Sequence, residues 1–386
     1  MVNEDNKFIY FDNAATTSPM DDVVFEYTIA LKNNWENPSS SHIKGMEVSR
    51  IFDKTKENIL KDLGFTNHEL IFTSGASEAN NLALKGYMEK YRNRGNHLII
   101  SSIEHPSITN AAKHLESLGF KVSYCPVNSN GKIDLEACEK LITDQTILIS
   151  VMAVNNETGT IQDVNGLVNL IKKFPKVKLH VDAVQAISKI NIPLDKVDMV
   201  TISLHKIGGL KSSGLLVKRK GIELVSQNDG GGQQNGLRSG TSDVPMALAS
   251  RVATSHIKEK LNKLDYIKSL VEPIYKYLEN NPDEFNINST LENPYIINFS
   301  LKKKKASVVV ENLSMENIMV GSHSACSSKL EVVSPILLAL GNSEIEAKNS
   351  IRLSFSIDNT PAEVEEFLQK FDKIIKEIRG WLHIVI

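Results

Sequence analysis

The sequence predicts an α/β protein in two parts: a large domain with a mostly parallel sheet flanked by helices, and a smaller α+β domain toward the C-terminus. Its 386 residues exceed what one ordinary hydrophobic core organises. Between residues 69 and 220, short apolar runs alternate with helix-like segments, the pattern of a parallel sheet covered on both faces. Beyond about residue 280 the apolar runs are fewer and lie near helical segments, which favours an α+β arrangement there.

The large sheet is expected to take its strands from the apolar runs. In chain order these are ELIFTS (69–74), HLIISS (97–102), KVSYCPV (121–127), TILISVMAV (146–154), VKLHVDA (177–183), VDMVTIS (197–203) and SGLLVKR (213–219). Amphipathic segments at 78–92 and 106–119 separate several of them and predict helices. Ligands gather at the carboxyl ends of such strands, so polar motifs that follow the runs are candidate site residues.

The second part of the chain begins with a long helical pattern over residues 244–280, which ends at NNPDEF. After it we expect a strand at YIINFSL (295–301), a helix near ASVVVENL (306–313), a strand at SIRLSFS (350–356) and a last helix from Pro361. The predicted large domain covers residues 15–262. The predicted small domain combines residues 1–14 with 263–386.

Composition excludes several classes of protein. Lys and Arg number 44 against 46 Asp and Glu, so no overall positive field would recruit nucleic acid or acidic lipid. Three cysteines without a CxxC pair argue against a disulfide framework and against a cysteine zinc site. The first residues lack the pattern of a signal peptide, and the apolar tail WLHIVI is too short to span a bilayer. We therefore expect a soluble protein of a reducing compartment, the cytoplasm.

Two residues that follow strands point to a cofactor. Lys206 lies in TISLHKIGG just past one apolar run, where alone it would be read as a solvated loop charge. Asp182 ends another apolar run, where a carboxylate is costly unless a cation meets it. Pyridoxal 5′-phosphate (PLP) supplies both partners, because its protonated ring nitrogen pairs with an Asp and its aldehyde forms a Schiff base with a Lys. Gln185 could then donate to the phenolic oxygen of the ring.

The phosphate of such a cofactor needs an anion site, and FTSGASEANN offers one. Gly75 permits a tight turn, after which Ala76 and Ser77 open a helix whose free N–H groups favour an anion. The alternative is an ordinary capped helix. Ser203 and His205 carry donors that could close around the same phosphate.

Three further motifs are ambiguous on their own. His105 in SSIEHPSI follows a strand and could stack on the cofactor and shuttle protons, or be a structural loop histidine. Asn155 in AVNNETG could bind cofactor or substrate through its amide, or be a turn residue. The glycine-rich GGGQQNGLRSGT, residues 230–241, is no dinucleotide fingerprint, because the G-x-G-x-x-G spacing is absent.

Cys326 lies in the polar stretch GSHSACSSK rather than among apolar neighbours. Buried structural cysteines usually have apolar neighbours, whereas an exposed thiol can react. This cysteine is therefore either an incidental surface thiol or a reactive one.

Taken together, the motifs resemble the NifS/IscS-type cysteine desulfurases of the class-V aminotransferase family. The matching stretches are YFDNAATT, FTSGASEANN, EHPSI, VNNETG, HVDAVQA, SLHK, GGGQQNGLRSGT, GSHSAC and SIRLS, in the order of the family and from Tyr10 to about Ile357. The resemblance implies a PLP enzyme of fold type I and a homodimer with its active site near the subunit interface. It implies conversion of L-cysteine to L-alanine, with the sulfur kept as an enzyme persulfide.

The resemblance also assigns roles by position. Lys206 would form the Schiff base, Asp182 would pair with the pyridinium, Gln185 would meet the phenolic oxygen and His105 would stack on the ring. The phosphate would be held by Ala76, Ser77, Ser203 and His205. Thr241 of the partner subunit would reach across to the same phosphate.

The remaining implied roles concern substrate and sulfur. Asn155 and Arg352 would hold the substrate carboxylate, for which the planar fork of an arginine is suited. Cys326 would take the sulfur and pass it to an acceptor protein, in iron–sulfur cluster assembly or in thiolation of tRNA or a cofactor. A cysteine that must reach both an internal cofactor and an external protein needs a polar loop.

The chain departs from the family at residues 207–214, 233–235 and 327–335, none of which carries an implied catalytic role. These departures bear on the dimer edge and on the choice of acceptor. The alternatives within enzymes are a selenocysteine lyase or another aminotransferase of fold type I, although an aminotransferase would not need Cys326. A catalytically inactive sulfur-relay scaffold is the alternative outside enzymes.

Overall fold

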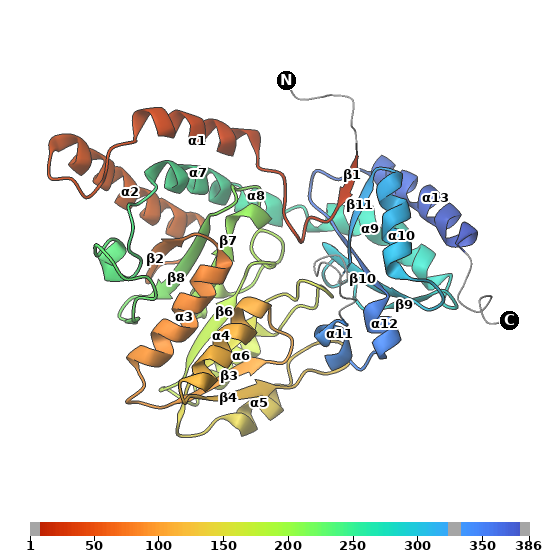
Figure 1. The fold of residues 1–386 in the computed structure, drawn as a ribbon, viewed down its shortest axis with the longest axis horizontal. Helices are drawn as coiled ribbons and strands as arrows, with labels where there is room; N and C mark the ends of the chain where they lie inside the picture. Colours follow the sequence, from red (N-terminus) through yellow and green to blue (C-terminus); the bar gives the residue numbers. More distant parts are fainter. Residues whose placement is uncertain (1–7, 323–332, 379–386) are drawn as a thin grey trace.

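The computed structural model of the chain describes residues 8–322 and 333–378, which are organised around two sheets (Figure 1). The large sheet has seven strands in the order β2-β8-β7-β6-β5-β3-β4. Their bounds are β2 His68–Thr73, β3 His97–Ser101, β4 Lys121–Cys125, β5 Thr146–Met152, β6 Lys178–Asp182, β7 Met199–Ser203 and β8 Gly214–Arg219. All the apolar runs expected to form this sheet do so, and the predicted α/β class is confirmed.

The sheet is mostly parallel. The strands β3 to β7 pair in parallel with their neighbours, and only β8 runs antiparallel, to both β7 and β2. The strands β3, β5 and β7 are buried along their whole length, because helices cover both faces. Their carboxyl ends therefore meet at one edge of the sheet, which is where ligands gather in this class of fold.

Alternate strand residues point to different cores, each covered by its own helices. Leu98 and Ile100 face a core that contains α3 and α4, whereas Ile99 faces the opposite core, which contains α6. The helices of this part of the chain are α1 Asp21–Asn33, α2 Ile43–Asp62, α3 Ala76–Lys90, α4 Pro106–Ser117, α5 Leu135–Leu141, α6 Val164–Ile171, α7 Val244–Ser255 and α8 Ile257–Leu261.

The small sheet has five strands in the order β1-β11-β12-β10-β9, and it lies on the other side of the molecule in Figure 1. Its strands are β1 Ile9–Phe11, β9 Phe285–Ile287, β10 Ile296–Leu301, β11 Ile318–Ser322 and β12 Ser350–Ser354; its helices are α9 Leu264–Glu279, α10 Ala306–Met315, α11 Pro335–Ala339, α12 Glu344–Lys348 and α13 Pro361–Glu377. The predicted elements at 295–301, 306–313, 350–356 and from Pro361 are all present. The exact domain division at residues 15 and 262 stays a prediction.

The long helical pattern over residues 244–280 is not one helix. It is divided into α7, α8 and α9, with breaks at His256 and at Asn262–Lys263. The reason is tertiary: α7 packs against α1 and α2, whereas the apolar face of α9 packs in the core of the small sheet. The chain passes from one sheet to the other within this stretch, so a continuous helix cannot serve both.

The N-terminal segment also joins the two parts. Strand β1 pairs with β11 in the small sheet, and the chain then crosses to α1 beside the large sheet (Figure 1). Residues 12–16 lie between these anchors. This short crossing places their backbone at the edge of the large sheet where the candidate site residues follow the strands.

The glycine-rich loop contains one of the departures from the family pattern, and the structure gives it a local purpose. The Gln234 amide accepts from the Phe72 N–H at 2.8 Å and donates to the Phe72 carbonyl at 2.9 Å. Phe72 belongs to β2, an edge strand whose outer backbone groups would otherwise lack a strand partner. Gln234 therefore caps this edge.

Candidate functional site

A cavity of about 680 Å³ lies at the carboxyl edge of the large sheet. It is bounded by residues that follow β2, β3, β6 and β7, by the N-terminal crossing and by β12 of the small sheet. Most of the residues singled out in the sequence line it: Ala76, Ser77, His105, Asp182, Gln185, Ser203, His205, Lys206 and Arg352. The structure thus brings together side chains that are far apart in the sequence.

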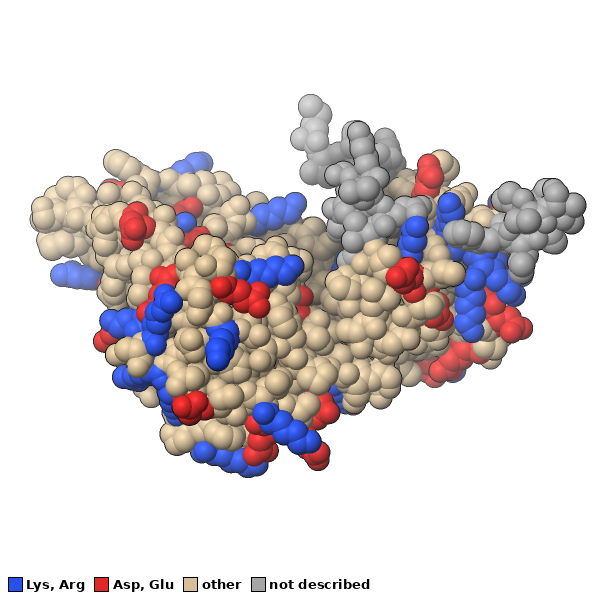
Figure 2. Space-filling model, turned by 60° about the horizontal axis from the view of Figure 1, so that its bottom comes forward, with Lys and Arg blue, Asp and Glu red and all other residues tan. Residues whose placement is uncertain are grey.

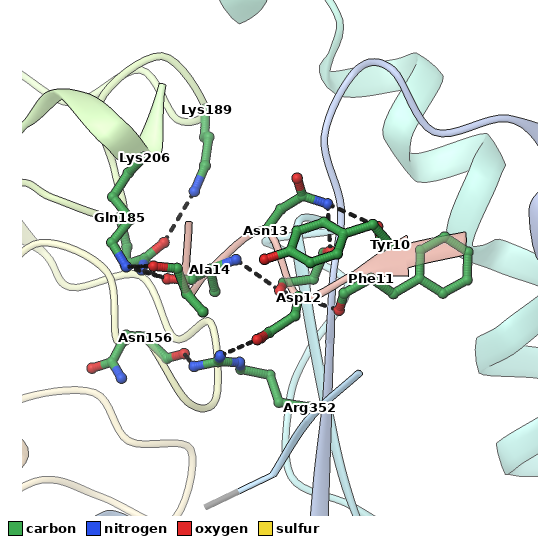
Figure 3. Close-up of polar contacts among 12 residues, drawn as sticks. Tyr10, Phe11, Asp12, Asn13, Ala14, Asn156, Gln185, Lys189, Lys206 and Arg352 are labelled. Atoms are coloured by element: carbon green, nitrogen blue, oxygen red, sulfur yellow. Dashed lines mark hydrogen bonds and ion pairs between the residues drawn. The ribbon is translucent and has the colours of Figure 1, made fainter. Parts of the chain in front are cut away.

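Lys206 ends a short helical turn, Leu204–Lys206, directly after β7. Its Nζ donates to the carbonyl oxygens of Ala14 and Ala15, each at 2.6 Å (Figure 3). The N-terminal crossing therefore holds the amine at the cavity. These two contacts are made by backbone atoms, so no side-chain pattern in the sequence pointed to them.

Asp182 is the last residue of β6 and is 5% exposed. One carboxylate oxygen accepts from the Asn80 amide at 2.8 Å, and the other accepts from the Val184 N–H at 3.0 Å. Burial raises the pKa of the Asp182 carboxyl above its ordinary value. A cation bound against this carboxylate would favour its ionised form, which is the pairing that a protonated ring nitrogen provides.

Gln185 lies one turn beyond Asp182 and is also buried. Its Nε2 donates to the Ala14 carbonyl at 2.9 Å, and its Oε1 accepts from the Lys189 amine at 3.0 Å (Figure 3). The crossing residue Ala14 thus contacts both Lys206 and Gln185. Sequence reasoning missed Lys189, because a lysine a few residues past a strand carries no signal of burial.

His105 caps the N-terminus of α4 with its ring exposed into the cavity. Its Nδ1 accepts from the Ser107 N–H at 3.1 Å, and because a backbone N–H can only donate, this nitrogen is unprotonated. The surrounding protein and the Lys206 ammonium lower the pKa of His105. At neutral pH the ring is therefore neutral with its proton on Nε2, a state that can both stack on a flat ring and donate.

The predicted phosphate site is a turn followed by the N-terminus of α3. Gly75 has φ +151°, and a side chain on the facing Gly214 would come within 2.5 Å of the Gly75 Cα. The two glycines allow β8 and the turn to approach closely, which leaves Ala76 and Ser77 at the cavity. Ser203 and His205 line the same end of the cavity. Burial and Lys206 lower the pKa of His205 to about 4, so this donor is neutral.

Arg352 comes from β12 and faces the cavity from the small sheet. Its Nη1 donates to the Asn156 carbonyl at 2.9 Å, and its Nη2 contacts the Asp12 carboxylate at 2.6 Å (Figure 3). Gly321, its neighbour across the β11–β12 pair, lies against the Nε and Nη2 atoms. The guanidinium is therefore fixed from both the large and the small sheet.

Three predicted site residues are not placed in this cavity. The Asn155 side chain is fully buried, accepts from the N–H groups of Glu157 and Thr158 at 2.9 and 3.0 Å, and donates to the Ile103 carbonyl at 3.1 Å. It shapes its loop, and the following Asn156 lines the cavity instead. Thr241 is exposed and lies outside the cavity lining. Cys326 lies outside the described residues.

The residues present fit PLP by the chemistry of their donors and acceptors. A buried carboxylate suits the ring nitrogen, an amine suits the aldehyde, and a helix N-terminus with hydroxyl and imidazole donors suits the phosphate. An amide N–H of Gln185, which lines the cavity, would suit the phenolic oxygen. Sequence reasoning missed Asn80 and Asp12, which hold Asp182 and Arg352, although both lie inside motifs that it used.

Comparisons with known proteins agree with this chemistry. A model of the family "Aminotransferase class-V" matches residues 9–367. A "NifS/IcsS protein homolog" of Lactobacillus delbrueckii subsp. bulgaricus is 36% identical, with 97% of this chain and 99% of that protein covered. A "Cysteine desulfurase IscS" of Buchnera aphidicola subsp. Baizongia pistaciae is also 36% identical, over 96% and 94% of the two chains. A solved structure titled "NIFS-LIKE PROTEIN" matches with a TM-score of 0.89 at 34% identity, over 96% of this chain and 100% of that one.

Proposed function

The chain belongs to the aminotransferase class-V family and is a PLP-dependent cysteine desulfurase, and we propose that it moves the sulfur of L-cysteine to Cys326 and on to an acceptor protein. The observation that carries the proposal is the convergence on one cavity of Lys206, Asp182 and Arg352, from three strands and two sheets. A lysine, a buried carboxylate and an arginine there are what a PLP enzyme needs for an amino acid substrate.

The cofactor, when bound, supplies an electron sink for charge released at the substrate α-carbon. The chain supplies the rest. Asp182 would keep the ring nitrogen protonated, Lys206 would bind the aldehyde and move protons at the α-carbon, and Arg352 would bind the substrate carboxylate. His105, which lines the cavity and is neutral with its proton on Nε2, would stack on the ring and shuttle a proton.

We propose that Cys326 receives the sulfur. In this step the C–S bond of L-cysteine breaks, an S–S bond forms at the Cys326 sulfur, and the carbon product leaves as L-alanine. Both flanks of the segment that carries Cys326 support the assignment. Strand β11 ends at Ser322, next to Gly321 and the Arg352 guanidinium. On the other side, the Ser334 hydroxyl donates to Glu157 at 2.5 Å, in the loop whose Asn156 carbonyl binds Arg352.

The test is to incubate the purified protein with L-cysteine and a thiol reductant and to assay alanine and sulfide together. We expect equal yields of both, and loss of both in Cys326→Ala while bound PLP keeps its yellow colour. Cys138→Ala is the matched control, because this cysteine is free and buried. Normal sulfide release by Cys326→Ala would mean that another thiol carries the sulfur. No products from a yellow wild-type protein would refute the proposed substrate.

Gly321→Ala is expected to weaken binding of the substrate carboxylate. A Cβ at this position would lie 2.7 Å from the Asp12 carboxylate and 2.9 Å from Arg352 Nη2, so the pair must shift. We expect the KM for L-cysteine to rise by roughly tenfold with a smaller change in kcat, since the contact holds substrate before and during reaction. Steady-state kinetics and a thermal melt of the same sample measure the effect. An unchanged KM in a folded variant would contradict the proposed role of Arg352 in binding the substrate carboxylate.

We also propose that the chain forms the homodimer that the family resemblance implies. The surface around α1 and the start of α2 exposes large apolar side chains, which a monomer in water rarely leaves uncovered. They are Val24, Phe25, Ile29, Leu31, Trp35, Ile43 and Met46, with Trp35 72% and Ile43 70% exposed. In the dimer, Thr241 of the partner subunit would complete the phosphate site.

The acceptor is proposed to be a protein that meets Cys326 at the surface, in iron–sulfur cluster assembly or in a thiolation pathway. On the face in Figure 2, basic and acidic side chains are interspersed, which gives no broad positive area for nucleic acid. Among the described residues, no helix has the length and apolar character needed to cross a bilayer. Cys125 and Cys138 are free, which supports a cytoplasmic location.

A further inference from the structure

Lys189 is a buried amine for which the reaction described above has no use. It is 6% exposed, and its Nζ donates to Gln185 Oε1 at 3.0 Å. Burial, together with the positive charges of Lys206, Arg352 and Lys260, lowers its pKa to about 7. Among the described residues, the charged groups that act on it are all cationic. A lysine buried in such a place destabilises the fold. Its presence therefore calls for a purpose other than stability.

The contact with Lys189 fixes the orientation of the Gln185 amide. The two ends of a glutamine amide have similar shapes, and either end can face a neighbour that both donates and accepts. The Ala14 carbonyl can only accept, so it selects Nε2, and a protonated Lys189 can only donate, so it selects Oε1. Because the pKa of Lys189 is about 7, the second constraint acts mainly below that pH, whereas the Ala14 carbonyl favours the same orientation at every pH.

This orientation determines what Gln185 offers to the cavity that it lines. An amide nitrogen carries two N–H groups, and the Ala14 carbonyl takes one of them. The second N–H remains as a donor. A donor suits an anionic oxygen, whereas a turned amide would present its own oxygen and repel it. When Lys189 is protonated, its positive charge lies next to the amide oxygen and strengthens the same preference (Figure 3).

We propose that Lys189 is a positioning residue that holds Gln185 as a hydrogen-bond donor toward the anionic phenolic oxygen of PLP and places a positive charge behind that contact. The inference rests on the proposed use of PLP in this cavity. It adds a residue that lies outside the cavity lining and acts through Gln185. It also gives Ala14 a second task, because its carbonyl holds both the Lys206 amine and the Gln185 amide.

The test is Lys189→Met, which keeps the length of the side chain and removes its charge and its donors. The readout is the pH midpoint of the visible absorption band of the purified holoenzyme, which reports protonation at the nitrogen that Lys206 contributes. The variant loses a nearby positive charge and a fixed hydrogen-bond donor to the phenolic oxygen. Both losses favour the protonated form of the nitrogen that Lys206 contributes. We therefore expect the midpoint to rise by roughly one pH unit, and kcat/KM at neutral pH to change with it.

Two further variants separate positioning from a structural role. Gln185→Ala should raise the midpoint as well. In the double variant Lys189→Met/Gln185→Ala, the midpoint should rise by less than the sum of the two single shifts, because Lys189 acts through Gln185. An unchanged midpoint in Lys189→Met, or additive shifts in the double variant, would overturn the proposal. A colourless wild-type protein would instead refute the proposed use of PLP, so the two failures are distinguishable.

Folding of Lys189→Met is checked by linkage. The pKa of this lysine is about 7 in the folded chain against an ordinary value of 10.5, so burial of the amine destabilises the folded state by an amount that grows as pH falls below 10.5 and is complete below about 7. Removing the amine should therefore leave thermal stability at neutral pH equal or higher. If Lys189→Met fails to fold, Gln185→Glu tests the same contact: a carboxylate still accepts from Lys189 but offers no N–H to the cavity. Its midpoint should rise, and an unchanged midpoint would overturn the proposal.

Discussion

Replacing Lys206 with Ala is expected to abolish the visible absorption of bound PLP and to lower turnover of L-cysteine by at least roughly 10⁴-fold. The variant loses the amine that would bind the cofactor aldehyde and also the group that would move protons at the substrate α-carbon. Absorption spectra of the purified protein and the alanine assay measure the two losses. Turnover above about 1% of wild type would contradict the role assigned to this lysine.

Lys206→Arg is the matched control for this prediction. Lys206 also donates to the carbonyls of Ala14 and Ala15, so loss of activity in Lys206→Ala could reflect a displaced N-terminal crossing. A guanidinium can still donate to these carbonyls and keeps the positive charge, but it cannot replace the amine in a Schiff base. We expect Lys206→Arg to be stable and as inactive as Lys206→Ala. Activity restored by Arg would mean that the lysine serves the backbone and not the chemistry.

The fold of the large sheet could be predicted because its central strands are continuous apolar runs. The strands β3, β5 and β7 are buried on both faces, so composition separates them from the helices between them. The small sheet was harder to predict. Its strands β1 and β9 have three residues each, which is too short for any periodicity to identify. Likewise, nothing local in residues 244–280 marks the crossing between the sheets that divides this helical stretch.

The candidate site could be predicted where a distinctive side chain follows a strand, as for Asp182 and Lys206. It could not be predicted where the contact uses backbone or depends on distant pairing. The carbonyls of Ala14 and Ala15 belong to residues with no chemical signature, and Asp12 meets Arg352 only because β1 and β12 both flank β11. Asn155 and Asn156 are adjacent and identical in type, so the sequence alone gives no reason to prefer the one that lines the cavity.

The Asp182→Asn substitution is expected to lower turnover by roughly 10³-fold while the protein still folds and binds PLP. The amide has nearly the shape of the carboxylate but no negative charge, so it cannot keep the ring nitrogen protonated. Burial makes this charge matter, because the carboxyl is 5% exposed and water cannot replace it. When both are measured on the same preparations, turnover should fall far more than the affinity for PLP. A parallel fall in both would show that Asp182 only holds the cofactor in place.

The surroundings of Asp182 explain why the fold should tolerate this change. The amide oxygen can still accept from the Val184 N–H, and its nitrogen would then face Asn80, whose Oδ1 is buried without a partner among the described residues. A turn of the Asn80 amide would pair the two side chains, although it would give up the hydrogen bond from Asn80 to Ser107 Oγ and place the amide nitrogen where Oδ1 now has no partner among the described residues. The variant should therefore fold with a somewhat lower stability. Asn80→Ala is the matched control: it removes the hydrogen bonds that Asn80 donates to Asp182 and Ser107 but leaves the charge, and should cost turnover about tenfold or less. If Asn80→Ala were as inactive as Asp182→Asn, orientation rather than charge would be what the carboxylate contributes.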